Sequence, residues 1–421
     1  MRVVVVGGGV AGLAAASEAH SLGAEVTLLE SSESYLPPKS GWPSLLSGEA
    51  QPGPSERIDH ELREFSKMGS LVAEVNVAER TARTSRGPVE YDSIVIATGS
   101  THADPTFRGS GKKNVFIMRG YPDYLRLAKE VRGFARVCVT GGGPLSLSIA
   151  EKVSSMGAKV LLLSPTGLLG QLSEVVRREV ERRAKEAGLV LLRSPLDGVA
   201  GVERVEAVVA SGSVHASEAL IFLPAPRPNP PRLAVEVGLN GGILVDDRMC
   251  SSSPAVYAAG DCAEVRLGST SSSSSSTMMY QSAARAMGRV AGANAAGGSA
   301  VARLASAASH TFFGYEVCYG GLSPVEGTRI GISLLEVSTP ARGDGLFCSL
   351  FFDRASTEIR GIQVAGRGAS SYEDAISLII SNGMTLPDLA YQESSFGPLS
   401  PTDLSPIALA AKTGLLMRKQ S

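Results

Sequence analysis

The sequence predicts an α/β fold with two Rossmann-like dinucleotide-binding domains, followed by a smaller α+β domain. Residues 2 to 30 read as strand, glycine-rich loop, helix and second strand, which is the pattern of one βαβ unit. Residues 136 to 164 repeat this order with a second glycine-rich loop. A chain of 421 residues also exceeds one ordinary hydrophobic core, so two or three domains are expected.

The composition is that of a globular enzyme and argues against several other classes of protein. A net charge of −1, with 19% charged residues, gives no overall field that would attract nucleic acid or an anionic membrane. Five cysteines without a CxxC pair argue against a disulfide scaffold and a thiolate metal site, so we expect a reduced cytoplasmic protein without metal. The N-terminus reads as neither signal peptide nor membrane span, and residues 410–421 are too weakly amphipathic for an anchor.

The first glycine loop has the residues that a dinucleotide requires. Gly7, Gly9 and Gly12 follow a run of valines and open a helix, and Glu30 ends the next strand. Such glycines allow a tight turn and close approach of a pyrophosphate to the helix N-terminus, and the carboxylate accepts the ribose hydroxyls. The alternative is a glycine-rich turn that only packs the helix on the sheet.

The remaining segments are assigned from residue pattern and composition. They are, in order, a β-meander that returns to the first sheet (79–100), a strand with a proline-rich exit (219–231), two short strands (241–264), a serine-rich loop (268–277) and a long helix (278–298). From about His310 the sequence indicates a third, α+β domain, with helical spacing in 371–392. It has no obvious catalytic cluster, so packing or subunit contact is expected.

Two distant segments accompany the first glycine loop, "IVIATG" at 94–99 and "VYAAGDCAE" at 256–264. Together the three segments resemble the signatures of the pyridine nucleotide-disulfide oxidoreductase superfamily. The resemblance implies that the first domain binds FAD, with Asp261 at the ribityl and phosphate region; alone, Asp261 would read as a helix-capping turn residue. The expected FAD-binding residues are Gly7, Gly9, Gly12, Glu30, Val75, Thr98, Gly99, Gly260 and Asp261.

The resemblance covers nearly the whole chain and is closest to the coenzyme A-disulfide reductase and NADH oxidase branch. It rests further on "GRVAGANAAGG", "GGLSPVEG", "RGIQVAG" and "DAISLIISNGMTLPDLA". It implies a homodimer in which a helix from about Thr277 points its positive N-terminus at the flavin. The implied domains are FAD-binding (1–108 and 241–300), NAD(P)-binding (109–240) and dimerisation (309–421).

The second glycine loop is expected, by its position, to bind NADH or NADPH through Gly141, Gly143 and Ser146. It departs from the family pattern at several positions, which are Pro144 for an aromatic residue, Ser146 for the third glycine, Ser148 for a glutamate and Ser164 for the ribose-binding acid. Loss of that acid weakens a preference for NAD, but no arginine stands beside Ser164 in the sequence to hold a 2′-phosphate. The alternative is a retained fold with a decayed pocket.

The position of the family's reactive cysteine is occupied by Ser40, in "SGWP". An alcohol forms neither a disulfide nor a sulfenic acid, so the cysteine-dependent reactions of the branch are in doubt. Lys39 could stabilise a reduced flavin or orient an anionic acceptor, or it could be an ordinary exposed lysine. Trp42 could stack on the flavin, although core packing is the plainer interpretation.

Other catalytic residues of the family are also replaced. Val10 stands where peroxidase members carry a histidine, and Ser395 or Phe396 stands at the position of a C-terminal tyrosine. Cys318 could supply another thiol, but a buried structural cysteine fits its sequence setting better.

These observations favour an FAD-dependent NAD(P)H oxidoreductase that passes electrons from the flavin directly to oxygen, a quinone or another small acceptor. Two alternatives stay open: a disulfide or polysulfide reductase that uses another thiol, and a flavoprotein that has lost turnover and acts as a sensor or partner. A quinone reductase at the membrane periphery is a further variant.

Overall fold

The computed structural model describes residues 1–35, 41–47, 60–266, 275–276, 279–342, 345–393 and 405–418. The chain divides into two compact units. Unit 1 consists of Met1–Trp42, Gln51–Asp104 and Ala225–Leu304, and unit 2 consists of Pro43–Ala50, Pro105–Pro224 and Ala305–Ser421. Each unit is described by itself.

Unit 1 is built on a parallel sheet with the strand order β20-β7-β1-β2-β3. These strands are β1 (Arg2–Val6), β2 (Glu25–Leu29), β3 (Ser66–Lys67), β7 (Ser93–Ile96) and β20 (Val256–Ala258). The valines of β1 are β-branched and buried, as expected for a central strand between two parallel neighbours. The predicted first βαβ unit is confirmed, because α1 (Val10–Ser21) connects β1 to β2.

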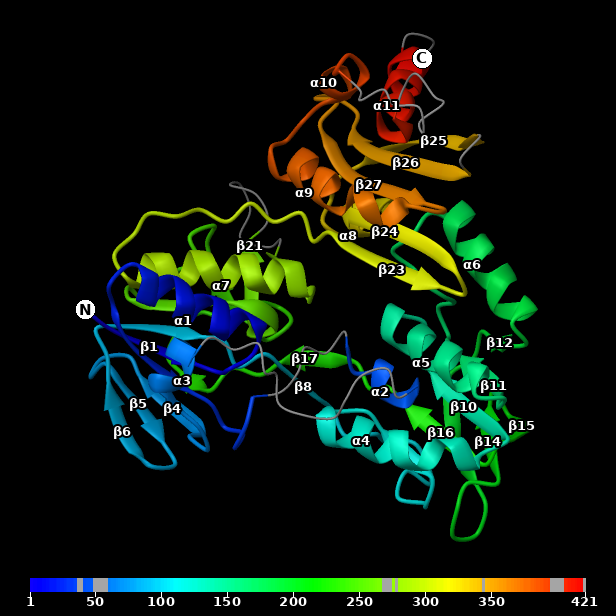
Figure 1. The fold of residues 1–421 in the computed structure, drawn as a ribbon, viewed down its shortest axis with the longest axis horizontal. Helices are drawn as coiled ribbons and strands as arrows, with labels where there is room; N and C mark the ends of the chain where they lie inside the picture. The colour runs from blue at the N-terminus through cyan, green and yellow to red at the C-terminus, as the bar shows by residue number, and fades with distance from the viewer. Residues whose placement is uncertain are drawn as a thin grey trace. The chain divides into compact units, whose positions relative to one another are not determined.

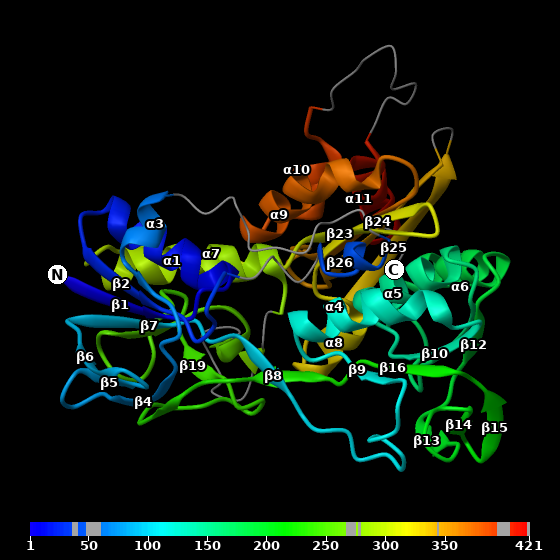
Figure 2. The same cartoon turned by 60° about the horizontal axis from the view of Figure 1, so that its bottom comes forward.

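The helices α1 and α7 (Gln281–Ala295) lie side by side in unit 1 (Figures 1 and 2). Their backbones meet closely, since a Cβ on Gly288 or Gly292 would lie 2.2 Å from the carbonyl oxygen of Ala11 or Ala15, respectively. The sequence predicts that this long helix begins at about Thr277. In the structure α7 begins at Gln281, and residues 279–280 are not helical.

The remaining strands of unit 1 form smaller sheets. The predicted β-meander returns to the first sheet only through β7, because its earlier strands belong to a separate sheet ordered β18-β4-β5-β6. The strands are β4 (Val72–Asn76), β5 (Thr81–Thr84), β6 (Gly87–Glu90), β8 (Ser100–His102), β17 (Pro226–Pro228), β18 (Arg232–Leu233), β19 (Ile243–Val245), β21 (Ala263–Arg266) and β22 (Ser275–Ser276). The short helix α3 (His60–Glu64) precedes β3.

Unit 2 contains a second parallel sheet, with the order β12-β11-β10-β16-β9. Its strands are β9 (Val115–Ile117), β10 (Arg136–Thr140), β11 (Lys159–Leu163), β12 (Val190–Leu192) and β16 (Ala219–Phe222). The helix α5 (Pro144–Ser155) joins β10 to β11, which confirms the second βαβ unit. The other elements of this part are α2 (Ser44–Ser47), α4 (Tyr121–Glu130), α6 (Glu174–Glu186), β13 (Leu196–Ala200), β14 (Ala207–Ala210) and β15 (Ser213–Ala216).

The C-terminal part of unit 2 is an antiparallel sheet covered by helices, ordered β23-β24-β27-β26-β25. Figure 1 shows α9, α10 and α11 together beside this sheet, and their apolar side chains share one core with it. The elements are β23 (Ala308–Phe312), β24 (Tyr315–Gly321), β25 (Leu334–Arg342), β26 (Leu346–Asp353), β27 (Ile359–Ala365), α8 (Pro324–Arg329), α9 (Glu373–Ser381), α10 (Leu386–Ala390) and α11 (Pro406–Arg418).

Candidate functional site

The first glycine loop forms a tight turn, and the space beside it is open among the residues that the structure describes. Gly7 has a φ of +106°, and a Cβ on it would lie 2.3 Å from the carbonyl oxygen of Ala97. A Cβ on Gly12 would lie 1.8 Å from the carbonyl oxygen of Gly7, so both positions exclude any side chain. A Cβ on Gly9 would meet no atom of the described residues within 4 Å, which leaves room for a phosphate to approach the backbone.

The N-terminus of helix α1 borders this space, and no side-chain cap from its N-cap residue occupies the N–H groups of its first turn. It begins at Val10, and its N-cap residue Gly9 has no side chain that could accept a hydrogen bond from the first turn. The first turn also lacks acidic side chains. The partial positive charge of the helix N-terminus is therefore available to an anionic ligand.

Glu30 lies at the end of β2, beside the glycine loop. Its Oε2 accepts a hydrogen bond from the N–H of Gly8 at 2.6 Å, and its Oε1 accepts one from the N–H of Ser32 at 2.7 Å. The hydroxyl of Ser31 also donates to Oε1, at 3.1 Å. The three bonds fix the carboxylate, and Oε2 keeps a lone pair for a further donor. A ribose hydroxyl pair is a ligand of that kind.

Asp261 lies on the same edge of the sheet, just after β20. The hydroxyl of Ser100 donates a hydrogen bond to Asp261 Oδ2 at 2.7 Å. A Cβ on the preceding Gly260, whose φ is +77°, would lie 3.0 Å from the Cβ of Ala11 and 3.7 Å from that of Ala284. The first turns of α1 and α7 therefore both flank the turn that carries Asp261.

The parallel sheet explains why most of the predicted FAD-binding residues come together. The glycine loop, Glu30, the Thr98–Gly99 pair and the Gly260–Asp261 pair each follow the carboxyl end of a strand, namely β1, β2, β7 and β20. Ligands of open α/β sheets bind at this edge. Thr98 itself donates its hydroxyl hydrogen bond to the carbonyl oxygen of Asn229 at 2.7 Å.

Val75 is the exception among the predicted FAD-binding residues. It lies on β4, in the smaller sheet, and its side chain is buried in the core of unit 1. The structure therefore does not bring this side chain to the edge where the others meet. Sequence reasoning also missed Ser100, which follows Gly99 directly and holds the Asp261 carboxylate.

The second glycine loop has the same geometry despite its substitutions. Gly141 has a φ of +104°, and the space beside Gly143 is open among the described residues within 4 Å. Ser146 is accommodated in place of a third glycine, because its buried hydroxyl donates to the carbonyl oxygen of Gly143 at 2.8 Å. The helix α5 begins at Pro144, where a missing N–H costs no helical hydrogen bond.

Ser164 occupies the position of the ribose-binding acid at the end of β11. Its hydroxyl donates to the carbonyl oxygen of Gly167 at 2.6 Å, and its side chain is buried. Gly142 packs against this turn, since a Cβ there would lie 2.1 Å from the same carbonyl oxygen. The serine thus stabilises the turn next to the glycine loop without supplying a charge.

All five cysteines lie within the described residues, and the pKa of each is raised. Four are buried and Cys250 is half-buried. Desolvation raises the pKa of Cys138 and Cys318 to about 12 and also raises the pKa of Cys250, Cys262 and Cys348. The thiolate is the attacking species, so none of the five is activated in this structure. Cys318 is a core residue of β24.

Several predicted residues lie outside the described residues, namely Ser40, Lys39, Ser395 and Phe396. Trp42 is described, and its side chain is 7% exposed, which agrees with a packing role.

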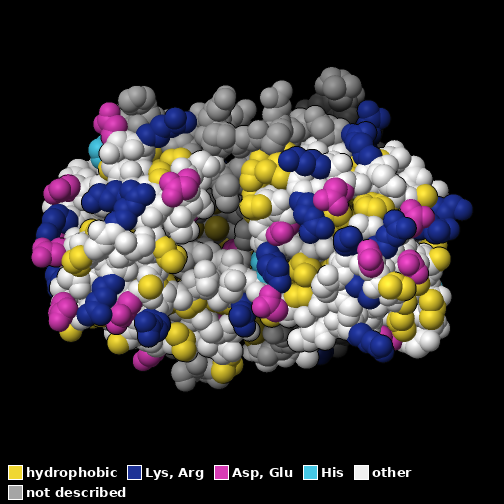
Figure 3. Space-filling view, turned by 90° about the horizontal axis from the view of Figure 1, so that it is seen from below, with side chains coloured by type: hydrophobic (Ala, Val, Ile, Leu, Met, Phe, Trp, Pro, Cys, Tyr) yellow, Lys and Arg dark blue, Asp and Glu magenta, His cyan; other side chains and the backbone are white. Residues whose placement is uncertain are grey.

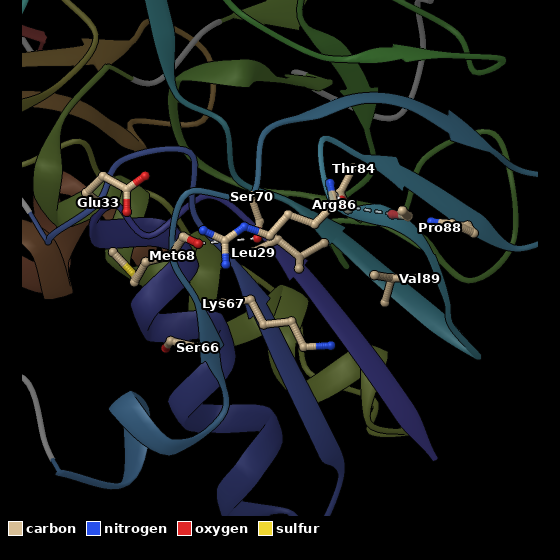
Figure 4. A pocket seen from close by; sticks show the side chains of 11 residues that line it. Leu29, Glu33, Ser66, Lys67, Met68, Ser70, Thr84, Arg86, Pro88 and Val89 are labelled. Carbon is tan, nitrogen blue, oxygen red and sulfur yellow. Dashed lines mark hydrogen bonds between the residues drawn. The ribbon is translucent and has the colours of Figure 1, made fainter.

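A pocket of about 540 Å³ lies elsewhere in unit 1, beside β2, β3 and the β5–β6 hairpin (Figure 4). Lys67 and Arg86 line it together with Glu33. The predicted FAD-binding residues are not among those that line it. We therefore do not assign the dinucleotide site to this pocket.

On the face drawn in Figure 3, basic and acidic side chains are interspersed among the described residues. Within the described ranges, none of the helices combines the length and the apolar composition that a bilayer span requires.

Comparisons with known proteins agree with this geometry. The family model of the pyridine nucleotide-disulphide oxidoreductases matches residues 1–288. The chain is 26% identical to an NADH oxidase of Methanocaldococcus jannaschii, over 99% of both chains. It is also 26% identical to an NAD(P)H coenzyme A polysulfide/persulfide reductase of Pyrococcus horikoshii, over 94% of each.

Solved structures show the same fold. A water-forming NADH oxidase from Lactobacillus brevis, bound to NADH, superimposes with a TM-score of 0.89 at 21% identity, covering 100% of this chain and 99% of that one. A NAD-dependent persulfide reductase from A. fulgidus gives the same TM-score of 0.89 and the same 21% identity, over 100% of this chain and 84% of that one.

Proposed function

Because the chain belongs to the pyridine nucleotide-disulphide oxidoreductase family, we propose that it is an FAD-dependent NAD(P)H oxidoreductase that works without a cysteine relay. In this proposal electrons pass from the flavin directly to a small acceptor. The observation that carries it is the state of the thiols: all five are buried or half-buried with raised pKa values. Position 40, where the resemblance places the family's reactive cysteine, is a serine.

The residues of unit 1 fit FAD. The open space at Gly9 and the N-terminus of α1 suit a pyrophosphate, and the fixed carboxylate of Glu30 suits a ribose. Asp261, held by Ser100, would bind at the ribityl and phosphate region, as the resemblance implies. When bound, FAD accepts two electrons as a hydride from a reduced nicotinamide and delivers them to the acceptor.

The second glycine loop supports a nicotinamide nucleotide as co-substrate. In the described part of the chain no atom fills the space beside Gly143, and Ser146 leaves the loop intact, so backbone groups can hold the phosphates as at the first loop. This speaks against a decayed pocket. The proposed regions are FAD binding by 1–108 and 241–300, NAD(P) binding by 109–240 and dimerisation by 309–421.

We further propose a homodimer that forms through the C-terminal region. Large apolar side chains are exposed there, namely Leu378 on α9, Tyr391 after α10, and Leu416 and Met417 on α11. Exposed apolar side chains also occur in the rest of the described chain, so these four are the candidates for the subunit contact that the resemblance implies. Sedimentation equilibrium measures the assembly directly, and a monomer at micromolar concentration would contradict it. The five unpaired thiols support a cytoplasmic location.

The proposed activity is tested by anaerobic titration of the purified FAD-bound protein with NADH and with NADPH. We expect at least one nucleotide to bleach the visible absorbance of the flavin, and the colour to return when oxygen or a quinone is admitted. Turnover should survive Ser40→Ala and alkylation of the accessible thiols. No bleaching with either nucleotide would refute the proposal and favour a non-enzymatic flavoprotein.

The name of the P. horikoshii relative favours sulfur compounds as a second candidate class of acceptor. If polysulfide is the acceptor, the buried thiols imply that it is reduced at the flavin. A rate of polysulfide reduction that is unchanged by Cys318→Ser would agree with this. A loss of that rate, with the fold retained, would assign the reaction to the thiol instead.

A further inference from the structure

We propose that Arg193 makes this protein select NADPH over NADH, by binding the 2′-phosphate of the nucleotide held at the second glycine loop. The inference rests on the proposed function, because it names the co-substrate of that same site. Arg193 follows β12, whereas the family pattern expects the ribose-binding acid after β11, where this chain has Ser164.

The sheet of unit 2 brings Arg193 to the position of the missing acid. The strands β11 and β12 are parallel neighbours in which Leu163 pairs with Leu192. The N–H of Ser164 donates to the carbonyl oxygen of Leu192 at 3.0 Å. Ser164 and Arg193 therefore follow adjacent strands at the same edge of the sheet, where the adenosine ribose of a dinucleotide binds.

The residue at the end of β11 no longer favours an unmodified ribose. A carboxylate there accepts the ribose hydroxyls and repels a 2′-phosphate. Ser164 carries no charge, and its hydroxyl already donates to the carbonyl oxygen of Gly167. The position thus gives NADH no charged acceptor and leaves NADPH free of that repulsion.

The guanidinium of Arg193 lies against the same turn. A Cβ built on Gly167 would be 3.5 Å from Arg193 Cζ and 3.5 Å from its Nε. The side chain is 63% exposed, so a ligand in solution can reach it. A positive charge next to an uncharged strand end is the arrangement that suits a 2′-phosphate.

Glu181 on α6 orients this guanidinium. Arg193 Nη2 donates to Glu181 Oε1 at 3.1 Å, and the Glu181 side chain is only 17% exposed. Among the described residues this is the one hydrogen bond of the Arg193 side chain, so most of its N–H groups stay available. The planar fork of an arginine binds a phosphate through two parallel hydrogen bonds.

The test measures binding of two nucleotide fragments to the FAD-bound protein by calorimetry: 2′,5′-ADP, which carries the 2′-phosphate, and 5′-AMP, which lacks it. We expect the wild type to bind 2′,5′-ADP at least about tenfold more tightly. Arg193→Gln should weaken 2′,5′-ADP by about tenfold to a hundredfold and change 5′-AMP by less than about threefold. Arg193→Lys, a point charge, should keep part of the affinity.

The matched control is Arg178→Gln. Arg178 is also exposed and pairs with a glutamate of α6, Glu174, so its loss should leave both fragments unaffected. The inference is overturned if 5′-AMP binds as tightly as 2′,5′-ADP, or if Arg193→Gln weakens both fragments equally while the melting temperature is unchanged.

These fragments carry no nicotinamide, so their binding is independent of the redox reaction. Discrimination between them without any bleaching of the flavin by either dinucleotide would refute the proposed function and leave this inference standing. Bleaching of the flavin by NADH, with no preference for 2′,5′-ADP over 5′-AMP, would refute this inference and leave the proposed function standing.

Discussion

The contact between α1 and α7 allows a quantitative test of how firmly the first glycine loop is held. We expect Gly292→Ala to destabilise unit 1. A Cβ at this position would lie 2.2 Å from the carbonyl oxygen of Ala15, whereas ordinary contacts begin at 3.4 Å. The two helices would therefore have to move apart by about 1.2 Å.

Two effects of opposite sign compete in this variant. Alanine in place of glycine favours the helix by about 0.5–1 kcal/mol. Overpacking of a tight contact costs about 1–3 kcal/mol. The atom that the new methyl group meets is a backbone oxygen, which cannot rotate away, so we expect the clash to win by about 1–2 kcal/mol. For a unit of this size the melting temperature should fall by about 2–8 °C.

The assay is thermal release of FAD, followed by flavin fluorescence, together with the flavin content of the purified protein. Gly133→Ala is the control, because no described atom lies within 4 Å of its Cβ position and the change should stay within about 0.5 kcal/mol. A melting temperature of Gly292→Ala at or above that of the wild type would refute the reasoning.

Three further predictions concern charge and thiol chemistry. Glu30→Gln should weaken FAD binding by about tenfold or more, because the ribose loses a charged acceptor and the N–H of Gly8 loses the carboxylate that it holds in place. Reconstitution of the apoprotein measures this affinity, and an unchanged value would count against Glu30 as a ribose ligand. At neutral pH a thiol-specific dye should label the native protein slowly, because burial raises the pKa of the thiols, and Cys250 should react first because it is half-buried. All five cysteines should be labelled only after unfolding, and rapid labelling of a buried thiol would contradict the raised pKa values. Burial raises the pKa of Glu151 above its ordinary value of 4.5, so the ionised form of this side chain opposes folding at higher pH. The variant Glu151→Gln can still accept from the N–H of Phe313, so it should raise the melting temperature at pH 7, and this gain should vanish as the pH falls below about 4.5. An equal effect at both pH values would contradict this reasoning.

Both βαβ units could be predicted because their information is local. Buried β-branched strands, glycines at fixed spacing and a following helix occur within about 30 residues of each other. The C-terminal α+β region was also predictable, since its strands and helices have distinct residue patterns. The start of α7 was placed too early, at about Thr277, because the serine-rich segment before it gives no clear capping signal.

The parts of the site that could not be predicted depend on which strands become neighbours. Ser100 and Asp261, which are 161 residues apart in the sequence, meet only because β7 and β20 pair. Arg193 approaches the turn after Ser164 only because β12 pairs with β11. Val75 lies on β4, in the smaller sheet, and its distance from the edge of the first sheet likewise depends on which strands pair. Such pairings are tertiary and leave no trace in local spacing.

The packing of α1 on α7 also dictates the order in which the cofactor site can be made during synthesis. The ribosome delivers the glycine loop and α1 first, but the helix that covers them arrives about 260 residues later, after the whole second parallel sheet. At roughly 5–20 residues per second this interval lasts tens of seconds. Until then the alanine-rich face of α1 has no partner and β7 lacks its neighbour β20. Flavin capture is therefore a late event, and nascent chains that stop before Gln281 should emerge without the cofactor.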